Sequence, residues 1–108
     1  MSCFAECEKL EHADLSGCAS LVKIDTFAFA GCRALAAVVL PPSVNNLMDS
    51  AFSNCRSLSQ VDFSRCHALE TVEEDAFANC AMLAAVDLSA CAALRTIGAS
   101  AFHECAAL

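Results

Sequence analysis

The sequence predicts an α/β repeat solenoid, in which one short strand and one short helical turn recur every 23–25 residues, and two observations support this prediction. First, the string F-x-x-C-x-x-L occurs five times: FAECEKL, FAGCRAL, FSNCRSL, FANCAML and FHECAAL. Second, intervals of 25, 23, 25 and 25 residues separate the phenylalanines of these strings: Phe4, Phe29, Phe52, Phe77 and Phe102. A fixed period of this length indicates a repeat protein whose units stack on one another.

The cysteines follow the same period. Of the nine cysteines in the 108-residue chain, five belong to the F-x-x-C-x-x-L string. Three more, Cys18, Cys66 and Cys91, each lie eleven residues after the cysteine of a string. Cys3 belongs to neither column. A buried free thiol packs as a small hydrophobic group, and stacked cysteines have Cβ vectors that run side by side rather than toward each other. We therefore expect a cysteine-rich core of structural thiols.

The segment after each leucine of the string carries the pattern of a strand. The four segments are LEHADLSGC, LAAVVLPPS, LSQVDFSRC and LAAVDLSAC, which fit, with modest substitution, L-x-x-L-x-L-x-x-N/C, the strand signature of a leucine-rich repeat. Ala13 weakens the first copy, and Ser43 replaces Cys in the second. The alternation in VDL and VDF points the apolar side chains inward and Asp outward. Pro41 and Pro42 lack amide donors, so they should end the second strand.

The second half of each unit is expected to contain the short helical turn. Ser50, Asp75 and Ser100 each precede an A-F pair, where they are placed to cap that turn. Phe27 occupies the same position in the first unit, and we expect its ring to pack against a neighbour rather than to lie exposed.

The unit AFAGCRALAAVVLPPSVNNLMDSAF, residues 28–52, resembles the BspA-like leucine-rich repeats, also called the Treponema-type class. The shared pattern is A-F-x-x-C-x-x-L-x-x-[VI]-x-L-P-x-x-V-x-x-[IL]-x-x-x-A-F, and the resemblance covers essentially the whole chain. It implies a leucine-rich-repeat horseshoe that serves as a binding scaffold, in bacterial surface proteins and in protozoa, without family-wide catalytic residues. Two units read L-S-x-C in place of L-P, which favours an intracellular member. Residues 1–108 are thus predicted to be one domain of about four strand-bearing repeats.

Composition and motifs exclude several classes of function. Six Lys and Arg against 13 Asp and Glu give a net charge of −7, which argues against nucleic acid or an anionic membrane as partner. There is no C-x-x-C pair, and the three histidines fall at no zinc-ligand spacing, so we expect no metal or other cofactor. No nucleophile elbow, P-loop or H-E-x-x-H occurs, so we expect no catalytic residues and no enzymatic activity.

The targeting signals favour a cytoplasmic protein. No run of about 18 apolar residues occurs, and the first residues lack the basic and apolar regions of a signal peptide. The odd number of cysteines argues against a secreted disulfide framework.

The candidate binding site is the concave strand face, where an acidic column with one apolar interruption would suit a basic peptide or loop. The proposed partner-binding residues are His12, Asp14, Val39, Gln60, Asp62 and Asp87. A simpler interpretation remains open, in which the aspartates only keep an exposed strand face soluble. We predict a non-catalytic protein–protein interaction scaffold.

Two alternatives concern the ends of the sequence. Cys105-Ala-Ala-Leu108 matches a C-a-a-X box, which would make this a small prenylated, membrane-associated protein. However, Cys105 and Leu108 also continue the columns of Cys80 and Leu83, so the repeat accounts for the same residues. Both ends are cut within a repeat and lack polar caps, which suggests either a segment of a longer array or ends that contact another chain. A fragment of a surface adhesin is the other alternative.

Overall fold

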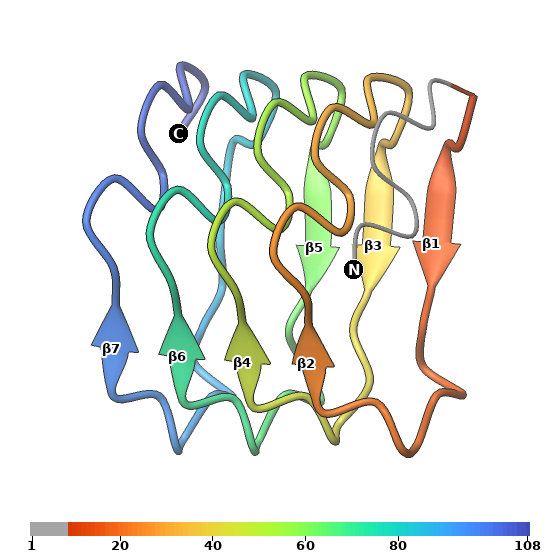
Figure 1. Cartoon of the computed structure of the whole chain (residues 1–108), viewed down its shortest axis with the longest axis vertical. Coiled ribbons are helices and arrows are strands. Elements are labelled where there is room, and N and C mark those ends of the chain that lie inside the picture. Colours follow the sequence, from red (N-terminus) through yellow and green to blue (C-terminus); the bar gives the residue numbers. More distant parts are fainter. Residues whose placement is uncertain (1–8) are drawn as a thin grey trace.

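The computed structural model describes residues 9–108, which form a solenoid of parallel strands arranged in two sheets (Figure 1). The sequence period divides this part of the chain into four units: 11–35, 36–58, 59–83 and 84–108. Units 1 to 3 each contribute one strand to each sheet, whereas unit 4 contributes to the second sheet alone. Cys3, Phe4 and Cys7 lie outside the described residues.

The first sheet is formed by the segments that the leucine-rich pattern predicts as strands. In the order β1-β3-β5, these strands are β1 (His12–Asp14), β3 (Ala37–Val39) and β5 (Gln60–Asp62). The register aligns Asp14 with Val39 and Val39 with Asp62, so equivalent positions of successive units stack as predicted. β3 ends at Val39, but β1 and β5 end at the equivalent residues Asp14 and Asp62 with no proline after them, so the role predicted for Pro41 and Pro42 stays a prediction.

The second sheet was not predicted. In the order β2-β4-β6-β7, its strands are β2 (Lys23–Ile24), β4 (Asn46–Leu47), β6 (Thr71–Val72) and β7 (Thr96–Ile97). Its arrows point opposite to those of the first sheet, because each unit descends through one sheet and returns through the other (Figure 1). A strand of two residues is too short to show the alternation of apolar and polar residues by which a strand is predicted from sequence.

The prediction of a short helical turn is wrong, because no helix occurs within residues 9–108. Ser50, Asp75 and Ser100 do not cap helices but adopt left-handed φ angles of 58, 58 and 61°. The physical reason is that backbone donors are used between units. Phe52 N donates to Ala76 O at 2.7 Å, for example, whereas an α-helix needs such donors for bonds along its own chain. The fold is therefore a solenoid of strands and turns.

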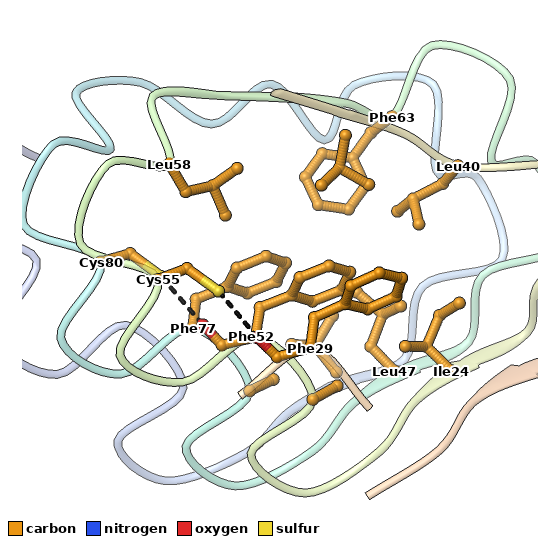
Figure 2. Close-up of a cluster of buried hydrophobic side chains, with 14 of the residues drawn as sticks. Ile24, Phe29, Leu40, Leu47, Phe52, Cys55, Leu58, Phe63, Phe77 and Cys80 are labelled. Carbon is orange, nitrogen blue, oxygen red and sulfur yellow. Dashed lines mark hydrogen bonds between the residues drawn. The ribbon is translucent and has the colours of Figure 1, made fainter. Parts of the chain in front are cut away.

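A stack of phenylalanine rings fills the space between the two sheets (Figure 2). Ring centroids of Phe29 and Phe52 lie 5.0 Å apart, those of Phe52 and Phe77 5.2 Å, and those of Phe77 and Phe102 5.3 Å, all nearly parallel. Phe52 and Phe77 are fully buried. Phe63 approaches Phe77 edge-on from the side of the first sheet, with centroids 6.2 Å apart.

The cysteines of the repeat string connect one unit to the next. The thiol of Cys55 donates a hydrogen bond to Phe29 O at 3.1 Å, and that of Cys80 donates to Phe52 O at 3.2 Å (Figure 2). Cys105 repeats the bond to Phe77 O. Cysteine suits this position because it is small and apolar, yet carries a donor for a buried carbonyl. The seven cysteines of the described chain are free thiols.

Unit 4 exposes apolar side chains that its predecessors bury. Ile97 is 46% exposed whereas Val72, its counterpart in β6, is fully buried, and Leu108 is 54% exposed whereas Leu83 is fully buried.

Along residues 9–108, no helix is long and apolar enough to cross a membrane.

Candidate functional site: the strand face

The structure places five of the six predicted site residues on the strands of the first sheet. His12 and Asp14 lie on β1, Val39 on β3, and Gln60 and Asp62 on β5. All are exposed except Val39, which is half-buried. Asp14, Val39 and Asp62 form one row, whereas Ala37 separates His12 from Gln60 in the neighbouring row.

Asp87, the sixth predicted residue, lies on an exposed segment of unit 4 that forms no strand. A fourth strand was expected in this segment, residues 84–88, and the structure does not contain it. The row of aspartates is therefore set by strand pairing only as far as Asp62.

Each aspartate of the row makes the same local hydrogen bond. Its Oδ1 accepts from the backbone N–H of the serine two residues later, at 3.0 Å in unit 1, 2.8 Å in unit 3 and 3.0 Å in unit 4. This is an Asx turn, in which the side chain imitates a backbone carbonyl. Our sequence interpretation missed this role, although D-x-S occurs in all three units and would have indicated it. The donating serines are Ser16, Ser64 and Ser89.

These hydrogen bonds favour the charged form of the three carboxylates. The serine side chain, and then the serine backbone N–H, lower the pKa values of Asp14, Asp62 and Asp87 below the usual value for Asp. Because a hydrogen bond to the carboxylate favours its charged form, all three groups are ionised at neutral pH.

The hydrogen-bond ladder of the first sheet weakens along the solenoid and then stops. Leu15 N donates to Val39 O at 2.8 Å, and its counterpart Leu40 N donates to Asp62 O at 3.4 Å. The next bond of this series would join Phe63 N to Asp87 O. Within the described chain, no backbone hydrogen bond joins residues 60–63 to residues 84–88. The strand β5 therefore has an open edge toward unit 4.

A hollow of about 180 Å³ lies at this open edge. Its lining consists of Val61, Asp62, Phe63, Ser64, Asp87, Ser89 and Ala90, which include two carboxylates and no basic side chain. Sequence reasoning had singled out the two aspartates, but not Phe63 or the separation of the units. The hollow offers negative charge, hydrogen-bond acceptors and an apolar wall.

The histidines, cysteines and carboxylates of the described chain do not gather into a metal site. No group of three or more such side chains in residues 9–108 has the arrangement that would hold a metal ion.

These observations define a class of protein. A solenoid of stacked 23–25-residue units, with a leucine-rich strand pattern and an exposed strand face, is a leucine-rich repeat protein. More narrowly, the chain belongs to the BspA type leucine-rich repeat family, because the sequence profile of that repeat region matches residues 1–108 with six copies.

A solved structure agrees with this assignment. The chain is similar to a leucine-rich repeat protein of T. pallidum, with 27% identity and a TM-score of 0.53 over 82% of this chain and 50% of that one. It is also similar to a leucine-rich cell surface protein of Faecalibacterium prausnitzii A2-165, with 26% identity and a TM-score of 0.42 over 72% of this chain and 29% of that one. The chain thus spans half the length of the T. pallidum protein. No curated protein matches the sequence.

Proposed function

We propose that this protein is a non-catalytic protein–protein interaction module whose strand face binds a partner that presents a basic peptide or loop. The observation that supports this proposal is the exposed row that holds Asp14 and Asp62, with Asp87 in the next unit. Repeat solenoids of this kind commonly bind partners along the face formed by their strands. Membership of the BspA type family is consistent with such a role.

Electrostatics determine which partner suits this face. The three carboxylates are charged throughout the neutral range, and their lowered pKa values extend the charged form to more acidic pH. Arg65 is the basic residue close enough to lower the pKa values of both Asp14 and Asp62. An incoming Lys or Arg has to compete with this side chain, and salt should weaken the binding because all these groups are exposed.

We also propose a cytoplasmic location. Free thiols persist in a reducing compartment, and the seven cysteines of the described part are free. Thiol titration of protein rapidly denatured from cells should find these cysteines reduced. Disulfides formed in the cell would contradict this location.

The prenylated alternative has no support in the structure. A lipid would be attached to the thiol of Cys105, which is buried and donates a hydrogen bond to Phe77 O at 3.2 Å.

The binding proposal can be tested by partner capture with charge-matched variants. The strand-face variant carries Asp14→Asn, Asp62→Asn and Asp87→Asn, in which the amide oxygen can still accept the serine N–H. The control carries three equivalent changes at exposed acids beside the second sheet, namely Asp25→Asn, Glu70→Gln and Glu74→Gln. Proteins captured by wild type and control, but not by the strand-face variant, would support the proposal. Capture that all three proteins share would contradict it.

A further inference from the structure

We propose that the hollow between β5 and residues 84–88 receives one Lys or Arg side chain of an extended partner segment that lies across the strand face. This inference rests on the proposed interaction function and assigns its recognition point to a single place in the solenoid. It is based on the opening of the sheet between units 3 and 4, on the acceptors that this opening exposes, and on the size of the hollow.

Phe63 explains why the sheet opens here. The inward column that contains Phe63 has leucine in every other unit, at Leu15, Leu40 and Leu88. The Phe63 ring is buried and lies edge-on to Phe77 of the same unit. We attribute the opening to the larger volume of this ring in a column that otherwise holds leucine. The ladder is disturbed on both sides of this residue, since the bond from Leu40 N is long and residues 84–88 form none with β5 in the part of the chain described.

The opposite side of unit 4 stays close to unit 3. Gly98 N donates to Val72 O at 2.7 Å, and a Cβ atom added to Gly98 would lie 2.6 Å from Glu74 N. A side chain at this position would collide with backbone, so glycine permits the close approach. Unit 4 is therefore near unit 3 at β7 and separated from it at β5, and the hollow lies at the separated side.

The open edge supplies a backbone acceptor as well as charge. Gln60 N and Asp62 O bond toward β3, and successive residues of a strand direct their backbone groups to opposite sides. The N–H and C=O of Val61 therefore face unit 4, where residues 60–63 have no ladder partner among the described residues. An ammonium or guanidinium group in the hollow would meet this carbonyl together with the carboxylates of Asp62 and Asp87.

The dimensions of the hollow select a side chain rather than a strand. A volume of about 180 Å³ holds one long side chain, whereas an added strand would need the whole length of the edge. The methylene groups of Lys or Arg would pack on Phe63 and Ala90 while the charged end stays among the acceptors. An acidic side chain would find no partner for its charge in the hollow. A purely apolar side chain would leave the two carboxylates unpaired.

Nuclear magnetic resonance with a matched pair of peptides tests this inference. The probe is the acetylated and amidated peptide Ser-Val-Arg-Val-Ser, and the control replaces its arginine by citrulline, which has the same shape but no charge. We expect the arginine peptide to shift the amide signals of Val61, Phe63 and Asp87, and the citrulline peptide to bind at least about tenfold more weakly. Salt at about 0.5 M should also weaken binding of the arginine peptide.

Two variants localise the effect. Phe63→Leu restores the residue of the other units and should allow unit 4 to close on β5, so the peptide-induced shifts should disappear while the signals of β1 and β3 stay in place. Asp62→Asn with Asp87→Asn keeps the serine hydrogen bonds but removes the charges, and it should also abolish binding. This second variant does not depend on repacking of the core.

The outcomes separate this inference from the function on which it rests. Shifts spread evenly over β1, β3 and β5, and retained in Phe63→Leu, would overturn the assignment to the hollow but leave a strand-face function standing. Equal binding of both peptides would likewise overturn the recognition of a cation. Shifts confined to the second sheet, or no binding at all, would overturn both proposals.

Discussion

Val39 stands two residues before Pro41, and this relationship explains why the acidic row of the strand face is interrupted in unit 2. In the other units, the residue two positions after the aspartate is a serine. Its backbone N–H donates a hydrogen bond to the carboxylate. Pro41 has no N–H, so a carboxylate in place of Val39 would find no such donor. Valine, which favours strands, occupies the position instead. The spacing of the charges thus follows from the chemistry of the turns.

The Asx turn predicts different effects for two substitutions of the same residue. Asp62→Asn keeps an oxygen that can accept from Ser64 N, so its stability should be close to that of wild type. Asp62→Val leaves this donor without its side-chain acceptor and should lower the free energy of unfolding by about 0.5–1 kcal/mol. Urea denaturation of both variants checks this. Equal losses in the two variants would show that charge, and not the hydrogen bond, is what stabilises the turn.

The phenylalanine stack predicts a large loss for Phe77→Ala. Phe77 is fully buried and lies between the rings of Phe52 and Phe102. Its removal should leave a cavity and lower the free energy of unfolding by about 3–5 kcal/mol. Gln60→Ala, on the exposed strand face, is the control and should change stability by no more than about 0.5 kcal/mol. A melting curve unchanged by Phe77→Ala would contradict the stack.

Phe27 is strained, and replacing it should stabilise the protein. Its φ of 60° lies in the left-handed region, which disfavours most residues by about 1–2 kcal/mol and favours Asn and Gly. The expectation that its ring is packed rather than exposed is wrong, because the residue is 49% exposed. Phe27→Asn should therefore raise the free energy of unfolding by about 1 kcal/mol.

Asn54 provides the opposite test. It belongs to a second set of equivalent positions with left-handed φ angles, Gly31, Asn54, Asn79 and Glu104. Its φ is also 60°, and its Oδ1 accepts from Asn79 Nδ2 at 2.9 Å. Asn54→Ala should lower the melting temperature, whereas Phe27→Asn should raise it. A lower melting temperature for Phe27→Asn would show that the ring contributes more by packing than its backbone strain costs.

The buried thiols predict a loss of stability at alkaline pH. Burial raises the pKa of Cys66 to about 11, and burial also raises those of Cys91 and Cys105. For Cys55, the hydrogen bond with Cys80 and then burial raise the pKa. In the unfolded chain these thiols ionise near pH 8.5. Because the folded state then holds more protons than the unfolded state, stability is fully present below that pH and falls as the pH rises through the folded pKa.

For Cys66 this window extends from about pH 8.5 to the folded pKa of about 11. In Cys66→Ala, the denaturation midpoint should fall less steeply with rising pH across this window than in wild type. Cys18→Ala, which removes an exposed thiol, is the control and should leave the decline unchanged. A wild-type stability that stays constant up to pH 11 would mean that the thiols ionise equally in both states.

The sequence could predict the stacking of units because each unit repeats the same contacts. Phe52 and Phe77 recur at the period of the chain and are buried one above the other, as expected. The alternation of apolar and polar residues was likewise sufficient to place Asp14 and Asp62 on the outward face of parallel strands. Such patterns are visible in the sequence because burial imposes a period on it.

Other features depend on hydrogen bonds between units, which leave no local pattern. The left-handed turn at Ser50 resembles a helix start in sequence, but the donors of this segment bond to the following unit. The strands of the second sheet are likewise made by pairing between units rather than by local propensity.

The sequence by itself determined the repeat, the inward and outward columns and the family, because each follows from which side chains recur at a fixed spacing. The tertiary structure alone decided that Asp62 and Asp87 share a hollow. In the described chain, residues 60–63 form no backbone hydrogen bonds with residues 84–88, whereas Gly98 lets unit 4 approach unit 3 closely at β7. Those are the effects of volume and contact between units, and a one-dimensional pattern does not record them.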